Sequence, residues 1–437
     1  MSEPVIGALL IALMFVLFAM GLEIAVSLGV VGVLGLLWLK GWTVGLGVVG
    51  SVAWSNATSF SFIAVPLFVF MSAILLHSGI GRGLFTAVAR WVGFLPGGLA
   101  VASVFSCAIF AAVSGSSVAT AATIGMIAIP EMERRGYGRP LICGSLAAGG
   151  TLGILIPPSI PMIIYGVMTE TSVGHLYMAG IVPGVILSLM FAVAIVLYAV
   201  ARPEAAPRRS EDRGSLRDKV RSVVEVAPVA VLIVVVLGGM YVGVVTPTEA
   251  AALGSTVSLV LAALARGLTW RALNRAFQET VRTTSMVVLI IIFASIFSHV
   301  MALIGAPSAL FATVVGLGLP RWALFTLIFA FLLLIAYALE ELSVMIIILP
   351  ILFPLVTGLG FDPVWFGVIM VVWLEIGFIT PPVGLNLFVI QGLMPGLSGR
   401  QITLGTTPFV VLMILLVVLL FLVPDLALWL PRQMLVK

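Results

Sequence analysis

Charged residues are scarce in this chain of 437 residues, at 9% of the total, whereas hydrophobic residues make up 62%. Such a composition excludes an ordinary water-soluble domain and indicates a membrane protein. The formal net charge of +4 therefore does not indicate a nucleic-acid partner. The two cysteines, Cys107 and Cys143, both stand in apolar context, so we expect packed thiols and no disulfide framework.

The sequence also lacks the residue patterns that enzymes need. There is no P-loop, so ATP does not drive this protein directly. The three histidines, His77, His175 and His299, are far apart and lack metal-ligand spacing. No nucleophile–base pair is evident. We therefore expect neither an enzyme nor a resident cofactor.

Long apolar runs are present along the whole chain, and a run of about 20 residues can cross a hydrocarbon core of about 30 Å. The first run lacks a basic n-region and a small-residue cleavage site, so we expect it to be a span and not a signal peptide. Expected spans lie near 5–22, 24–39, 62–78, 141–168, 176–201, 226–245, 249–265, 284–304, 364–394 and 403–430. Segments 81–93 and 269–282 are amphipathic and are predicted to be helices lying in the interface.

The two halves of the chain resemble each other at a spacing of about 224 residues. The stretch from Gly153 to Pro158 and the stretch from Gly377 to Pro382 both read Gly-x-x-x-Pro-Pro within an apolar run. Each break frees backbone groups that lipid cannot satisfy. Two breaks at matching places are typical of transporters that bind ions at interrupted helices.

Each half also contains two short apolar arms around a polar turn, at about 96–130 and about 322–356. Both segments are predicted to be re-entrant hairpins. We therefore expect an all-α polytopic membrane protein of two inverted-topology repeats, each with five spans and a hairpin. The first repeat comprises 1–201 and the second 223–437, and a cytoplasmic linker at 202–222 joins them.

The distribution of positive charge predicts the orientation. With the N-terminus outside, all but four of the 21 Lys and Arg residues fall on the cytoplasmic side, as the positive-inside rule requires. The four exceptions are Lys40, Arg321, Arg432 and Lys437. Both termini are therefore predicted to be periplasmic, in a protein of the bacterial inner membrane.

The two breaks are candidate cation sites because proline removes an N–H and displaces the carbonyl four residues earlier. Oxygen cages of this kind suit a hard cation such as Na⁺. The alternative is a plain kink in each span. The freed carbonyls belong to Gly153, Ile156 and Pro158 in the first break and to Gly377, Thr380 and Pro382 in the second, where the Thr380 hydroxyl is a further ligand.

The first hairpin turns at Ser114-Gly115-Ser116-Ser117, followed by Thr120 and Thr123. The helix that starts there points its N–H groups at the turn, which favours an anion such as a substrate carboxylate. Close helix packing through small residues is the alternative.

Three carboxylates, Glu340, Glu341 and Glu375, stand at apparent membrane depth, where such groups are costly and usually functional. For Glu375, hydrogen bonding to a backbone N–H is an equally good explanation. Glu23 and Glu249 begin spans and are interpreted as helix N-terminal residues.

At these residues the chain resembles the large membrane subunit of tripartite ATP-independent periplasmic (TRAP) transporters. The matching stretches cover both halves: AAVSGSSVATAATIG, GTLGILIPPSIPMIIYG, MAGIVPG, TPTEAAA, LGFDPVWFG and EIGFITPPVGLNLFVI. One position departs from the family, which usually has a single Asp ten residues before the hairpin proline, here Pro350. This chain has Glu340 there, followed by a second acid, Glu341.

The resemblance implies an elevator-type secondary transporter that uses a Na⁺ gradient to import an organic acid anion. A periplasmic binding protein would deliver the substrate, and a small four-helix membrane subunit, expected as a separate chain, would be a further partner. Carried over by motif, the first Na⁺ site comprises Ser114, Ser116, Gly153, Ile156 and Pro158. The second comprises Gly377, Thr380, Pro382 and Glu341. The substrate would lie between the two tips, contacted by Ser116, Ser117, Thr120, Ser159, Glu340 and Ser343.

Two alternative functions are a channel and a different kind of carboxylate transporter. A channel would usually need a symmetric ring of subunits, whereas internal inverted repeats favour alternating access in one chain. The nearer alternative is a stand-alone Na⁺- or H⁺-coupled carboxylate transporter of related fold that needs no binding protein.

Overall fold

The computed structural model describes residues 3–207, 216–336, 341–381 and 384–434, and this part of the chain is helical, with no strand. The helices of the first half are α1 (Glu3–Ala19), α2 (Ile24–Ala57), α3 (Ala64–Ser78), α4 (Leu84–Val92), α5 (Gly98–Ser114), α6 (Ser117–Arg134), α7 (Arg139–Leu155), α8 (Ile160–Thr169) and α9 (Val173–Ala201). The second half contains α10 (Leu216–Ile233), α11 (Gly239–Tyr241), α12 (Pro247–Leu264), α13 (Trp270–Leu303), α14 (Ala306–Gly316), α15 (Arg321–Ala336), α16 (Glu341–Gly358), α17 (Pro363–Ile379), α18 (Leu385–Leu393), α19 (Gly399–Leu422) and α20 (Asp425–Arg432). Within the described residues, eight helical stretches are long and apolar enough to cross a membrane.

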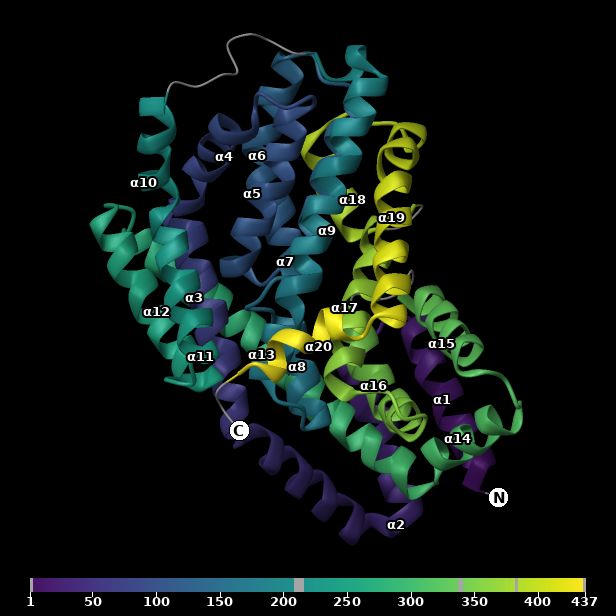
Figure 1. Cartoon of the computed structure of the whole chain (residues 1–437). Helices are drawn as coiled ribbons and strands as arrows, with labels where there is room; N and C mark the ends of the chain where they lie inside the picture. The colour runs from purple at the N-terminus through teal and green to yellow at the C-terminus, as the bar shows by residue number, and fades with distance from the viewer. Residues whose placement is uncertain (1–2, 208–215, 337–340, 382–383, 435–437) are drawn as a thin grey trace.

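A bundle around α7 forms the centre of the molecule (Figure 1). Every residue of α7 from Leu141 to Leu155 is buried, which explains why this helix is apolar on all sides. Helices α5, α6, α17, α18 and α19 all pack against it. Glycines permit the closest approach, since a β-carbon at Gly144 would collide with the backbone of Gly405 on α19.

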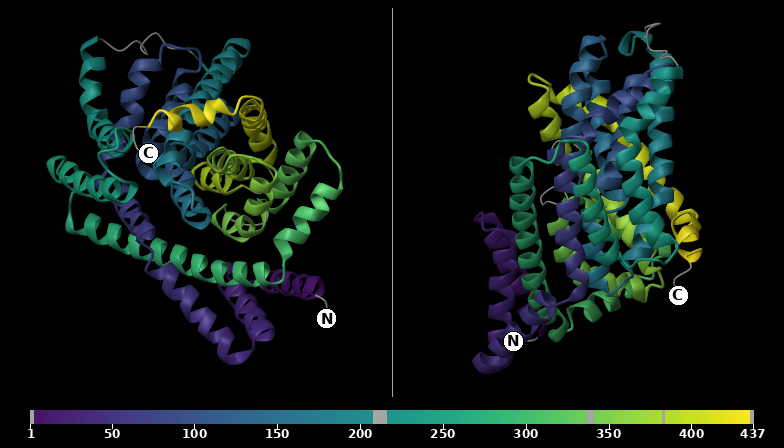
Figure 2. Two further views of the ribbon diagram at one scale, coloured as in Figure 1. Left: turned by 60° about the horizontal axis from the view of Figure 1, so that its bottom comes forward. Right: turned by 90° about the vertical axis from the view of Figure 1, so that its left-hand side faces the viewer.

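A second layer lies beside this bundle. Helix α13 crosses the molecule with α1 and α2 on its outer side (Figure 2, left view). Glycines three residues apart on α2 face large side chains of α13: Gly29 meets Phe293, Gly32 meets Ile296 and Gly35 meets Val300. The hydrophobic effect does not drive helix association within a membrane, so close van der Waals packing must do so. Small residues at these positions let the two long helices approach closely enough for it.

Most expected helices are present, and three boundaries differ. Residues 269–282 are not a separate helix but the first part of α13, because no Gly or Pro interrupts 270–303. At about 1.5 Å per residue, α13 is about 51 Å long. The span expected at 403–430 ends at Leu422, because Pro424 disfavours the helical conformation at Val423. Helix α2 continues beyond residue 39 to Ala57, with a non-helical glycine at Gly41.

Other local expectations are confirmed. The helix predicted within 81–93 is present as α4, and its place in the membrane interface stays a prediction. Glu249 occupies the third position of α12 in a capping box, where its side chain accepts from the Thr246 backbone N–H at 2.8 Å. Both cysteines are buried thiols. The inverted-repeat relationship and the membrane orientation stay predictions.

Candidate functional site

The tip of the first hairpin is a tight turn held by its own hydroxyl groups. Helix α5 ends at Ser114, and Gly115 follows with a left-handed φ of 61°, which glycine adopts without strain. Ser116 caps α6, and its side-chain oxygen accepts from the Ala119 N–H at 3.4 Å. The Ser114 and Thr120 hydroxyls lie 2.6 Å apart. The predicted turn between two helices is therefore confirmed.

The first break packs directly on this tip. Helix α7 ends at Leu155, Ile156 is extended, and α8 begins at Ile160. A β-carbon at Gly153 would lie 2.6 Å from the Ser116 carbonyl oxygen, and one at Gly115 would lie 2.9 Å from the Pro158 carbonyl oxygen. The structure thus brings the tip and the break together, with backbone oxygens of both at the contact.

The second break packs against the first arm of the second hairpin. Helix α17 ends at Ile379, and Thr380 is extended with its hydroxyl donating to the Ile376 carbonyl oxygen. A β-carbon at Gly377 would lie 3.4 Å from the carbonyl oxygen of Ala336, the last residue of α15. Two predicted site residues, Glu340 and Pro382, lie outside the described residues.

The two halves of the chain meet at Ser117. Its hydroxyl lies 3.0 Å from Glu375 Oε2 on α17 and 3.0 Å from the Gly150 carbonyl oxygen on α7. Asn386 Nδ2 on α18 donates to the same hydroxyl oxygen at 2.7 Å and to the Ala147 carbonyl oxygen at 3.4 Å. The three side chains are at most 1% exposed. This buried cluster joins the first tip to both sides of the second break.

The cluster is rich in acceptor oxygens. Ser117 has one hydroxyl hydrogen for two acceptors, Glu375 Oε2 and the Gly150 carbonyl. Glu375 Oε1 and Asn386 Oδ1 are buried with no hydrogen-bond partner among the described residues. The carboxyl group of Glu341, at the start of α16, interacts electrostatically with that of Glu375. An arrangement of this kind suits a proton or a small hard cation.

A cavity of about 110 Å³ lies beside the first tip. Ser114 and Ser116 face it from the tip, and α3 and α13 form the opposite wall. Glu279 of α13 lines the cavity, and its carboxylate is 2.8 Å from His77 Nε2 at the end of α3. The full lining is Val69, Ser72, Leu76, Phe110, Ser114, Ser116, Ala119, Ile160, Glu279 and Thr283.

The predicted substrate contacts do not share one surface. Ser116 lines the cavity, whereas three others are at most 1% exposed and have hydrogen bonds within the protein: Ser117, Thr120 and Ser159. Ser343 is 3% exposed near the start of α16.

Sequence reasoning missed four polar residues of the site: Ser72, Glu279, Thr283 and Asn386. Asn386 could have been identified from the sequence, because a polar residue within the apolar run of α18 is often functional. Glu279 could not, because its segment has the amphipathic pattern of an interfacial helix.

The chain matches the family model described as "Tripartite ATP-independent periplasmic transporter, DctM component" over residues 11–426. The chain belongs to this family. It is 40% identical over 375 residues to the C4-dicarboxylate TRAP transporter large permease protein DctM of Pseudomonas aeruginosa, covering 85% of this chain and 86% of that protein. It is 36% identical over 447 residues to the protein of the same name from Rhodobacter capsulatus, covering 99% of each.

Among solved structures, the YdaH transporter of Alcanivorax borkumensis superposes with a TM-score of 0.63 at 16% identity, covering 89% of each chain. At this identity the likeness shows a shared fold. The family resemblance inferred from six sequence stretches is thus confirmed, as is an all-helical, multi-pass transporter fold.

Proposed function

We propose that this TRAP large permease subunit imports an organic acid anion across the bacterial inner membrane, driven by an inward Na⁺ gradient. The observation that carries the proposal is the packing of the first tip on the first break, where Gly153 lies against the Ser116 carbonyl. A kink with a purely structural role would not need a polar, glycine-containing turn from another segment placed against it.

Sodium coupling is supported by the chemistry of the oxygens at the two breaks. The first site comprises Ser114 and Ser116 with the α7 end at Gly153, Ile156 and Pro158, and these oxygens are neutral. Hard cations prefer such ligands. The second site comprises Gly377, Thr380 and Pro382 with carbonyls near Glu341, and the Glu341 carboxylate would offset part of the ion's charge.

The substrate would bind in the cavity beside the first tip. Helix α6 begins there, and its N-terminal N–H groups and dipole favour a carboxylate at Ser116. The P. aeruginosa and R. capsulatus relatives are named for C4-dicarboxylates. A dicarboxylate or a related carboxylate is therefore the proposed cargo.

An elevator movement is supported by where the cavity lies. Its walls come from the first hairpin on one side and from α3 and α13 on the other. Movement of the bundle that carries both breaks along α3 and α13 would move the cavity across the membrane. The family is tripartite by its description. We propose a periplasmic binding protein that delivers the anion and a small four-helix membrane subunit as the other parts.

The test is uptake into proteoliposomes that contain this chain and the small subunit, with the binding protein and labelled substrate outside. We expect uptake with an inward Na⁺ gradient and none when K⁺ replaces Na⁺ and only a pH gradient is applied. Equal uptake under both conditions would overturn Na⁺ coupling. Equal uptake without the binding protein would favour the stand-alone carboxylate transporter.

A further inference from the structure

The buried cluster at Ser117 lies between the two breaks of the chain. Ser117 directly follows Ser116, whose carbonyl oxygen lies against Gly153 at the first break. Glu375 stands two residues before Gly377 on α17, at the second break. The carbonyl carbon of Ser116 is bonded to the amide nitrogen of Ser117 in one planar peptide group. A displacement of Ser117 therefore also displaces the carbonyl oxygen at the first break.

The Ser117 hydroxyl forms a bridge across the second break. Glu375 Oε2 approaches it at 3.0 Å from α17, before the break, and Asn386 Nδ2 approaches it at 2.7 Å from α18, after the break. Both contacts form together only at one relative placement of the two helices. All three side chains are at most 1% exposed, so solvent does not replace these hydrogen bonds when they are lost.

The bridge is only partly satisfied by its own groups. Ser117 has one hydroxyl hydrogen, and two acceptors compete for it at 3.0 Å, Glu375 Oε2 and the Gly150 carbonyl oxygen. Glu375 Oε1 and Asn386 Oδ1 are buried with no hydrogen-bond partner among the described residues. A buried network of this kind is weakly stabilised. A modest further interaction at either break can therefore decide whether the bridge forms.

Glu341 links the second break to the strength of this bridge. Its carboxyl group interacts electrostatically with that of Glu375, and two like charges in a buried place repel each other. Within the described part of the chain, no Lys, Arg or His side chain forms an ion pair with Glu375. A cation beside Glu341 would offset the repulsion. The charge-assisted hydrogen bond from Ser117 to Glu375 would then be stronger.

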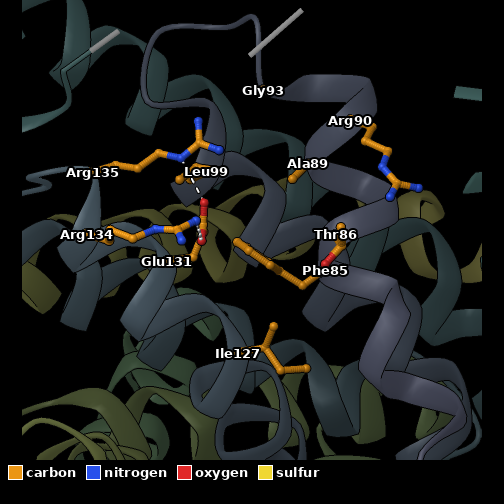
Figure 3. Close-up of a pocket in the computed structure, with 10 residues that line it drawn as sticks. All are labelled: Phe85, Thr86, Ala89, Arg90, Gly93, Leu99, Ile127, Glu131, Arg134 and Arg135. Carbon is orange, nitrogen blue, oxygen red and sulfur yellow. Dashed lines mark hydrogen bonds and ion pairs between the residues drawn. The ribbon is translucent and has the colours of Figure 1, made fainter. Parts of the chain in front are cut away.

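The first hairpin is held at the end opposite its tip. Arg134 and Arg135 both contact the carboxylate of Glu131 in the last turn of α6 (Figure 3). The Leu99 N–H, at the start of α5, donates to the Tyr137 hydroxyl just after α6 at 3.3 Å. A cavity of about 380 Å³ lies between α4 and α6 at this end. The two arms are thus tied to each other at their base, and the bridge holds the opposite end.

Given the two Na⁺ sites of the proposed function, we propose that Glu375 and Asn386 are positioning residues that couple those sites through Ser117. Na⁺ at the second site strengthens the bridge, because it relieves the repulsion between Glu341 and Glu375 and fixes α17 relative to α18. The bridge holds the tip, which places the Ser116 carbonyl oxygen for the first ion. Coupling between two sites is reciprocal, so each ion raises the affinity for the other.

The experiment measures equilibrium binding of ²²Na⁺ to the purified full-length protein, both its Hill coefficient and the amount bound at saturation. For the wild type we expect two bound ions and a Hill coefficient clearly above unity. Asn386→Leu keeps the approximate volume but loses the hydrogen bond to Ser117. It should still bind two ions, with a Hill coefficient near unity.

The half-saturating Na⁺ concentration of Asn386→Leu should rise by about 2- to 12-fold. This is the square root of a coupling factor of about 5- to 150-fold, which is typical of linked sites. Ser117→Ala removes the bridging hydroxyl itself and should also reduce the Hill coefficient to near unity. It gives a second reading if Asn386→Leu does not fold.

Asn56→Leu is the matched control, because Asn56 Oδ1 on α2 accepts from another serine hydroxyl, that of Ser295 on α13, at 3.2 Å. It should keep the Hill coefficient of the wild type. A wild-type Hill coefficient of unity, or an unchanged one in Asn386→Leu and Ser117→Ala, would overturn the coupling and leave the two ion sites standing. Half the bound amount in Asn386→Leu would make Asn386 an ion ligand and also overturn it. No saturable binding by the wild type would overturn the Na⁺ sites and the coupling together.

Discussion

The hydroxyl group of Ser117 lies 3.0 Å from Glu375 Oε2, although 258 positions separate the two residues in the sequence. Asn386 donates to the same hydroxyl oxygen. The first hairpin tip is thereby attached to the helices on both sides of the second break. Parts of the two halves that carry the proposed ion sites therefore form one packed unit.

This contact predicts energetic coupling between Ser117 and Glu375. Glu375→Leu should lower the free energy of unfolding by about 1–3 kcal/mol, because buried polar partners lose a hydrogen bond. Glu375→Gln, which still forms hydrogen bonds, should cost less. In a double-mutant cycle, Ser117→Ala and Glu375→Leu should be clearly non-additive. Additive losses in thermal unfolding would mean that the contact contributes nothing.

The hydroxyl groups of the first tip should matter for Na⁺. Ser114→Ala and Ser116→Ala each remove a proposed ligand oxygen, worth about 1–3 kcal/mol, or roughly 5- to 150-fold in apparent Na⁺ affinity. Uptake measured against Na⁺ concentration should recover at high Na⁺. The neighbouring Val118→Ala, at a partly exposed apolar side chain, is the control and should match the wild type. Wild-type Na⁺ dependence in both serine variants would make the tip a packing turn.

The close approach at Gly153 should tolerate no side chain. A β-carbon there would lie 2.6 Å from the Ser116 carbonyl oxygen, a backbone atom that cannot move alone. Gly153→Ala should abolish uptake while the protein still inserts in the membrane. Gly392→Ala on α18 is the matched control, because nothing lies within 4 Å of its β-carbon position. Normal uptake by Gly153→Ala would show that the break and the tip do not need this contact.

The orientation of the chain can be tested in its charged linker. Arg213→Cys, in an otherwise cysteine-free background, should resist an impermeant thiol reagent added from the periplasm and react after the membrane is opened. The reason is the positive-inside distribution of Lys and Arg. Labelling from the periplasm would place the linker outside and reverse the predicted topology.

The helices and the first tip could be predicted because their signals are local. Apolar length indicates a span, and a Ser-Gly-Ser-Ser turn between apolar arms indicates a hairpin tip. The Pro-Pro pairs mark helix ends at Leu155 and Ile379 for the same reason, since proline cannot continue the backbone hydrogen bonds. The family resemblance rested on the same segments.

Contacts between distant segments could not be predicted from local patterns. Asn386 looked like one polar residue in an apolar helix, and its contact with Ser117 depends on how α18 packs against α6. Glu279 lines the cavity because α13 is one uninterrupted helix, whereas its amphipathic start suggested a separate surface helix. Tertiary packing decided both positions.

Binding of ²²Na⁺ to the purified protein, measured by scintillation proximity over a range of Na⁺ concentrations, tests most directly whether the tip and the break hold the coupling ion. We predict saturable binding by the wild type and by Gly392→Ala. Gly153→Ala should lose much of this binding, because the added β-carbon displaces the Ser116 carbonyl oxygen from the first site. Saturable binding of equal affinity and amount in all three proteins would contradict the proposed ion site.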